Sequence, residues 1–353
     1  MYTKKVFRAK DLAKWTRFET IFFIVFITAF VSAYYFFELS WLKIPWTPLA
    51  LIGTAVAFVI GFQNNSAYGR IWEARKIWGG IVNTSRTFGM YVQDMVTNEY
   101  AINKVEESVL KNEIKTLTYR HIAWMTALRH AMRVGKPWET VVKEKTNKEW
   151  NAIVSPPEWK SGLESDLKPY LTEAEISQIM EKGNKQTALL YLQSKHLRAL
   201  KEKGIIWEFS FLELESLLQE LFALQGKSER IKNFPYPRQF ATLNHYFMWI
   251  FVVLLPLAIV PQFAEIGADI AASNNTLGKV FIWLAIPFYV AVAWIFHTME
   301  RIGRTGENPF EGSANDVPIS TIARGIEIDL RQNLGEAKAD IPEQFPVIYD
   351  TQM

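Results

Sequence analysis

The stretch Ala50–Gly80 reads ALIGTAVAFVIGFQNNSAYGRIWEARKIWGG, and it decides how the rest of the chain is interpreted. No Asp, Glu, Lys or Arg occurs from Ile44 to Gly69, and this window is long enough for a helix to cross a membrane. No proline separates it from the tryptophan-rich amphipathic segment that follows. The pattern predicts one long helix that leaves the bilayer and continues into water. Such helices couple a pore or gate in the membrane to a soluble domain.

The composition excludes several classes of protein. Lys and Arg number 39 against 36 Asp and Glu, and no single run concentrates the basic residues, so nucleic-acid binding is not indicated. The absence of cysteine rules out disulfides and thiolate metal sites. The sequence contains no phosphate-binding loop, dinucleotide-binding glycine motif or nucleophile elbow. We therefore do not expect an enzyme.

Windows without ionisable residues occur four times along the chain, and each is long enough to span a bilayer as a helix. They are Thr20–Phe37, Ile44–Gly69, Gln239–Ala264 and Val280–Met299. One such window can be a buried helix of a soluble protein, but four together indicate a polytopic membrane protein. Three prolines, Pro256, Pro261 and Pro287, are expected to interrupt the last two spans.

The flanking charges predict the orientation and the domain plan. Lys and Arg are frequent before the first span and throughout the segment between spans two and three, which the positive-inside rule assigns to the cytoplasm. Both chain termini are then cytoplasmic. The expected parts are a cytosolic segment 1–19, spans 20–69 with a pore helix 44–69, a cytosolic helical domain 70–238, spans 239–299 and a cytosolic tail 300–353.

The second span carries two stripes of side chains. Gly53, Ala57 and Gly61 recur every four residues and form a small-residue stripe on which neighbouring membrane helices can pack. Thr54, Phe58 and Phe62 follow one residue later, about 100° around the helix. These aromatic rings face lipid or core, or they line a narrow apolar constriction. The spacing alone leaves both interpretations open.

The five histidines lack the spacing of a metal site, so each is interpreted as a satisfied surface or interfacial side chain and no metal is expected. They are His121, His130, His196, His245 and His297. The span centres carry no Asp, Glu, Lys or Arg, whereas secondary transporters usually place ionisable groups there. A transporter is therefore a weaker interpretation than a channel with a neutral, aromatic pore.

Three motifs along the chain are informative together: GFQNNSAYGRIWEARKIWGG (Gly61–Gly80), IKNFPYP (Ile231–Pro237) and ENPFEGSANDVP (Glu307–Pro318). They resemble the bestrophin family, and specifically its bacterial branch. Their order, with two spans before the insert and two after it, extends the resemblance from the first span to about residue 335. The resemblance implies an all-α, homopentameric ion channel in which five copies of the second span line the pore and a helical cytosolic chamber continues it.

The resemblance also implies which residues narrow the pore. The hydrophobic neck of the family falls on Thr54, Phe58 and Phe62, with Thr54 in place of the usual Ile. The cytosolic aperture falls at or near Leu212, although core packing is the alternative for that residue. Animal members bind Ca²⁺ after their N-P-F motif. Most of the carboxylates that a hard cation prefers are missing here, so we expect no cofactor and no calcium clasp, and we expect Asp316 to cap the following helix.

These observations predict passive conduction of small monovalent ions, with chloride and other anions favoured. The ring edges of Phe58 and Phe62 carry positive quadrupole density, which favours an anion if they face the pore. A sodium-selective channel of the same family, a secondary transporter and a membrane scaffold are the alternatives. The expected partners are four further copies of the chain, the lipid bilayer and the permeant ions, chloride or sodium, without nucleic acid.

Overall fold

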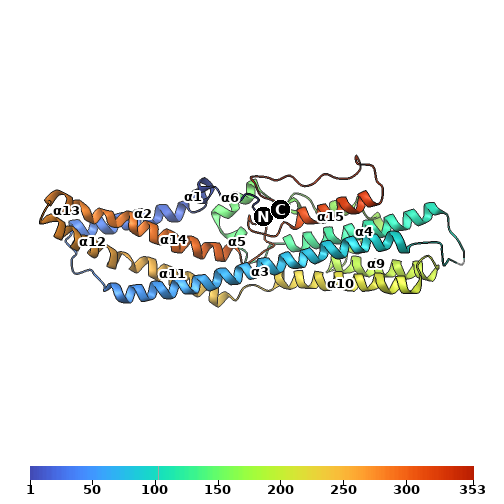
Figure 1. Ribbon diagram of the computed structural model, residues 1–353, viewed down its shortest axis with the longest axis horizontal. Coiled ribbons are helices and arrows are strands. Elements are labelled where there is room, and N and C mark those ends of the chain that lie inside the picture. Colours follow the sequence, from blue (N-terminus) through green and yellow to red (C-terminus); the bar gives the residue numbers. More distant parts are fainter. Residues whose placement is uncertain (102) are drawn as a thin grey trace. The chain divides into compact units, whose positions relative to one another are not determined.

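The computed structural model describes residues 1–101 and 103–353, apart from the side chains of residues 142 and 143, and its regular secondary structure is almost entirely helical (Figure 1). In the described ranges, extended pairing is limited to isolated bridges of Thr351 with Tyr2 and Ile348. The chain forms two compact units. We call residues 5–69 with 235–307 the membrane unit, and residues 1–4, 70–234 and 308–353 the insert unit.

The longest helix, α3, runs without a break from Trp46 to Met95 and supplies residues to both units (Figure 1). Its 50 residues confirm the prediction of one helix that continues from the second span into the insert. Proline is confined to its first turn, at Pro48, where the missing N–H has no intrahelical partner to lose. Beyond that point, no residue removes a backbone hydrogen bond from the helix.

The membrane unit contains the four predicted spans. Helices long and apolar enough to cross a membrane are Arg17–Phe36, Trp46–Met95, Arg238–Ala271 and Asn275–Thr305. In terms of individual helices, the unit comprises α1 (Ala9–Trp15), α2 (Arg17–Phe36), the first half of α3, α11 (Arg238–Leu254), α12 (Pro256–Ala271), α13 (Asn275–Phe281), η2 (Ile282–Leu284) and α14 (Ala285–Thr305).

The last two spans are interrupted, but not at all three predicted prolines. Helix α11 ends at Leu254 and α12 begins at Pro256. The 3₁₀ turn η2 precedes α14, whose third residue is Pro287. Pro261, by contrast, lies inside α12. The prediction was wrong for Pro261, because a transmembrane helix tolerates proline where neighbouring groups satisfy the freed carbonyl.

The insert unit packs the second half of α3 against helices from the insert and from the tail. Its helices are α4 (Glu107–Arg133), α5 (Thr140–Lys143), α6 (Lys145–Ile153), η1 (Pro157–Trp159), α7 (Leu163–Leu167), α8 (Glu173–Met180), α9 (Lys185–Glu202), α10 (Glu208–Asn233) and α15 (Ile319–Asn333). Trp78 of α3 and Trp124 of α4 are fully buried in one core. The Trp124 indole donates a hydrogen bond to Gln225 Oε1 of α10 at 2.9 Å, so its polar atom is satisfied inside that core.

The tail helix begins where the sequence predicts, but Asp316 does not cap it. Helix α15 follows Pro318, which has no side-chain oxygen to offer, and no side chain caps its first turn. Asp316 instead accepts hydrogen bonds from Gly312 N at 2.6 Å and from Arg133 Nη1 at 3.0 Å. The prediction was wrong because a buried guanidinium, distant in sequence, binds this carboxylate.

Candidate functional site

The face of α3 that carries Thr54, Phe58 and Phe62 is exposed in the subunit. Residues on the opposite side recur every three or four positions and are buried: Leu49, Gly53, Val56, Ile60 and Gln63. Phe58 is 67% exposed and Phe62 is 59% exposed. Neither ring belongs to the core of its own chain. Each therefore faces lipid, a neighbouring subunit or a conduction path.

The two aromatic rings of this stripe contact each other. The centroids of Phe58 and Phe62 lie 4.7 Å apart with an interplanar angle of 88°, an edge-to-face arrangement. This geometry directs the positive edge of one ring at the negative face of the other. The Thr54 hydroxyl donates to Ala50 O at 2.9 Å, so its proton is used by its own helix. The stripe thus presents rings, a methyl group and a satisfied hydroxyl, with no charge.

The small-residue stripe is divided between two environments. A Cβ on Gly53 would lie 2.7 Å from the ring of Phe251 in α11, so this glycine admits a close approach within the chain. Ala57 is exposed, and a Cβ on Gly61 would meet nothing within 4 Å. Only Gly53 packs against a neighbouring helix of the same subunit. Ala57 and Gly61 remain open to lipid or to another chain.

Directly after Phe62, α3 carries a buried polar side chain to which the sequence analysis assigned no role. Gln63 Nε2 donates to Glu307 Oε1 at 3.1 Å, and Gln63 Oε1 accepts from Asn244 Nδ2 at 3.1 Å. Arg238 forms an ion pair with the other oxygen of Glu307. We call Arg238, Glu307, Gln63 and Asn244 the polar relay. Its sequence signal was the run of amides immediately after an apolar span.

Leu212 lies in the first turns of α10, on a different side from the leucines that fill the core. It is 54% exposed, whereas Leu214, Leu218 and Leu221 are buried. Core packing within the subunit is therefore excluded for this side chain, which is free to face an opening or another subunit.

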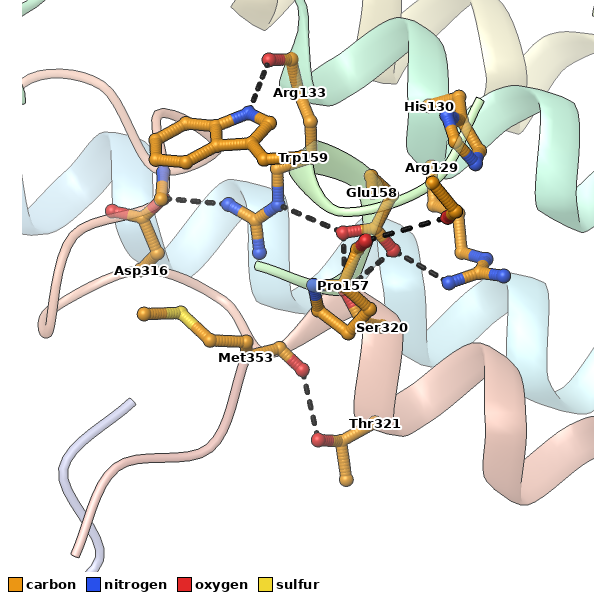
Figure 2. Close-up of polar contacts among 12 residues, drawn as sticks. Arg129, His130, Arg133, Pro157, Glu158, Trp159, Asp316, Ser320, Thr321 and Met353 are labelled. Carbon is orange, nitrogen blue, oxygen red and sulfur yellow. Dashed lines mark hydrogen bonds and ion pairs between the residues drawn. The ribbon is translucent and has the colours of Figure 1, made fainter. Parts of the chain in front are cut away.

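The tail motif forms a buried ionic cluster in the insert unit (Figure 2). Arg133 pairs with Asp316 at 3.0 Å, and Arg129 Nη1 binds Glu158 Oε1 at 2.6 Å. The Ser320 hydroxyl donates to both oxygens of Glu158. Burial raises the pKa of Glu158, but the two guanidinium groups and the hydroxyl outweigh burial, so this pKa lies below its usual value. The cluster joins α4, η1 and the tail.

The histidines are distributed as structural residues. His130 contacts Asp166 at 2.8 Å, as expected for a satisfied side chain. His121 is fully buried against Phe88, with ring centroids 4.9 Å apart, and burial lowers its pKa to about 3. The prediction of a surface or interfacial position was wrong for His121 and for His297. The apolar core of the insert unit surrounds His121, and aromatic rings of the membrane unit surround His297. Among the residues described, no three His, Asp or Glu side chains are grouped to hold a metal ion.

Comparison with known proteins places this arrangement in a family. The chain is 23% identical over 308 residues to the voltage-dependent anion channel-forming protein YneE of Escherichia coli K12, covering 86% of this chain and 83% of the relative. It is 24% identical over 290 residues to the similarly named RSc3414 of Ralstonia nicotianae, covering 82% and 78%.

The solved structures show the same fold. A bacterial bestrophin homologue from Klebsiella pneumoniae matches with a TM-score of 0.70 at 19% sequence identity, over 91% of this chain and 98% of that chain. A family model described as bacterial/fungal bestrophin protein matches residues 16–332. The resemblance inferred from the three motifs is confirmed, and the chain belongs to the bacterial and fungal bestrophin family.

Proposed function

We propose that the chain assembles as a closed ring of five copies and conducts small monovalent anions, chloride among them, along a path lined by α3. The observation that carries the proposal is the exposed stripe Thr54, Phe58 and Phe62. One such helix cannot enclose a pore, and cyclic repetition supplies the missing walls. The relatives named as voltage-dependent anion channel-forming proteins support an anion channel. The chain is not an enzyme, since its family and named relatives are channel-forming.

Selection in such a neck rests on dehydration and weak dipoles. The stripe bears no formal charge, so an ion gains no salt bridge there and loses part of its hydration shell. Ring edges of Phe58 and Phe62 that face the path stabilise an anion over a cation. An apolar constriction of this kind also closes by losing its water, without a plug. One structural element thus provides the filter and the gate.

Reversal potentials in a NaCl gradient across a planar bilayer test the proposal. We expect the reversal potential to move toward the chloride equilibrium potential. A shift toward the sodium potential would instead establish a cation channel with the same neck. Saturable, coupled uptake into liposomes without single-channel currents would establish a transporter. Absence of any flux from correctly assembled protein would leave only a scaffold role.

We further propose that both chain ends and the insert unit lie in the cytoplasm, with the membrane unit in the inner membrane of a bacterium. Lys and Arg in segment 1–19 and throughout 70–238 support this orientation. Cysteine substitutions offer a direct measurement, since the natural chain has no cysteine. A cysteine at exposed Ser40, between the first two spans, should react with an impermeant maleimide from outside. One at exposed Lys195 should not.

We propose that the tail loop is held without calcium. The oxygens that a cation would bind are already used: Asp316 Oδ2 by Arg133 and Gly312, and Asp316 Oδ1 by the Ser313 hydroxyl at 2.5 Å. Glu311 is bound by the Thr140 hydroxyl at 2.6 Å. Carboxylates that already accept these hydrogen bonds do not fit a calcium clasp. Currents and thermal stability are expected to be the same in calcium and in chelator, and a calcium-dependent change in either would contradict this.

A further inference from the structure

The polar relay lies beside Phe62, the last residue of the stripe on α3. Gln63 immediately follows Phe62 and is only 1% exposed, and Asn244 and Glu307 are likewise buried. The next residue, Asn64, donates to Met299 O of α14 at 3.0 Å. Two consecutive side chains therefore connect α3 to α11, α14 and the residue that begins the tail motif. All of these groups belong to the membrane unit.

The direction of each hydrogen bond in the polar relay is fixed by its charged end. An ionised carboxylate only accepts, so Glu307 requires the NH₂ group of Gln63 to point toward it. The carbonyl oxygen of Gln63 then points the other way and accepts from Asn244. Arg238 donates to the remaining oxygen of Glu307. Each of these contacts pairs a donor with an acceptor, and Gln63 uses both ends of its amide.

Apolar contacts near this level come from Ile60, which is buried in the core of the membrane unit. Such contacts alone specify the rotation of a membrane helix less strictly than polar pairs do. Lipid tails are as apolar as the side chains, so there is little hydrophobic drive to prefer one helix face over another. Ala57 and Gly61 add no interlocking side chain to neighbours within the subunit. Polar pairs in such surroundings specify register and orientation. Gln63 and Phe62 project about 100° apart, so a fixed Gln63 also fixes the direction of the Phe62 ring.

We propose that the polar relay is a positioning element of the neck: it sets the rotation of α3 at Phe62 and thereby the width and the ring orientation of the constriction. Gln63 is the central positioning residue, because its amide binds both Asn244 and Glu307. The inference rests on the proposed role of Phe58 and Phe62 as the neck. None of the four relay residues needs to touch a permeant ion.

An exchange of two side chains tests this directly. Gln63→Glu places a second carboxylate against Glu307 and removes the donor between them. Combining Gln63→Glu with Glu307→Gln restores every pairing. Arg238 then donates to the amide oxygen introduced at position 307, while that amide and Asn244 both donate to the carboxylate introduced at position 63. The matched control is Gln239→Glu, which adds the same charge at an exposed position of α11 outside the relay.

Single-channel conductance and the chloride-to-sodium permeability ratio are the readouts, with assembly and melting temperature measured on the same samples. We expect Gln63→Glu to change conductance or open probability by about tenfold. A change of this size corresponds to the free-energy cost of leaving a buried polar group without a hydrogen-bond partner. The double variant should return to the parental values, and Gln239→Glu should leave them unchanged. A role in folding alone would move the melting temperature without moving permeation in the channels that assemble.

The outcomes separate this inference from the function on which it rests. If the parent protein carries no anion current, the proposed function fails. If the parent conducts anions and assembled Gln63→Glu behaves like it, the relay does not position the neck. A double variant that keeps the altered permeation also overturns the inference, because the effect then comes from charge at position 63. Should Gln63→Glu fail to assemble, the double variant alone decides in the same way.

Discussion

Phe58 and Phe62 are two large apolar side chains exposed on a helix whose opposite face is buried. Replacing both by Ala removes the rings that narrow the proposed path. We expect higher unitary conductance, more current through the closed state, and weaker anion discrimination if the ring edges contribute. Planar-bilayer recordings of Phe58→Ala/Phe62→Ala provide the measurement.

Phe36→Ala is the control for that experiment, because Phe36 is equally exposed at the end of α2 but outside the stripe. It should conduct like the parent. If the stripe variant also conducts and selects like the parent, the rings only face lipid or a neighbouring subunit. Neither variant should lose much subunit stability, since neither side chain contributes to the core of its own chain.

Leu212 and Leu214 are a matched pair on α10, two residues apart and opposite in burial. Leu214→Ala should lower the free energy of unfolding by about 2–5 kcal/mol, as for a fully buried leucine. Leu212→Ala should cost far less and should raise permeability to large anions relative to chloride. Thermal melts and bi-ionic reversal potentials measure the two effects. Unchanged permeability ratios would move the search for the aperture to a neighbour such as Phe209.

The lowered pKa of Glu158 determines how the stability of the insert unit changes with pH. A carboxylate with a lowered folded-state pKa stabilises the fold above the ordinary glutamate pKa of about 4.3. That contribution is lost as the pH falls through the folded-state value. Melting temperature should therefore drop on acidification. Glu158→Gln should be less stable at neutral pH, by about 3–5 kcal/mol, and less sensitive to acid.

Exposed Glu164 of α7 supplies the comparison for that measurement. Glu164→Gln should keep both the parental stability and the parental acid response. If Glu158→Gln showed the same acid response as the parent, the sensitivity would have to come from other carboxylates of the insert unit.

Gly53 and Gly61 of α3 lie in different surroundings. Gly53→Ala should strain the membrane unit by about 1–3 kcal/mol, the usual cost of overpacking, because the new methyl meets the Phe251 ring. Gly61→Ala meets nothing within 4 Å in the subunit, and alanine favours helix. Its effect should appear only between chains. Melting temperature and oligomer size, measured on both variants, distinguish an effect within the subunit from one between subunits.

The elements were predicted to different extents by local sequence. The continuity of α3 follows from an uninterrupted helical pattern without proline after its first turn, and it is correct from Trp46 to Met95. The break at Pro256 follows from the missing N–H of proline. The course of α12 through Pro261 did not follow, because neighbouring helices decide whether a proline in a membrane helix is tolerated.

The central prediction for the whole molecule is the number of chains in its assembly. The subunit of 40.8 kDa exposes a long apolar stripe and two small residues on α3, surfaces that a ring of copies would cover. Five chains give a protein mass of about 200 kDa. Native mass spectrometry or light scattering with detergent correction measures it. A monomer or dimer would contradict the channel proposal.

The four spans, the long helix and the family could all be predicted from the amino-acid sequence. The length of an apolar segment and the helical spacing of its side chains are local properties. The spans and the order of the motifs could therefore be predicted from the sequence alone. The same period placed Phe58 and Phe62 on one stripe, although it could not say what that stripe faces.

The contacts between distant side chains, by contrast, could be found only in the folded chain. Gln63 binds partners 181 and 244 positions away in the sequence, at Asn244 and Glu307. Asp316 binds Arg133, 183 positions away, rather than the helix beside it. A buried polar group must find a partner somewhere, but its own neighbourhood in the sequence does not say where. The sequence therefore shows that α3 crosses the membrane, while the folded chain shows how α3 is held there.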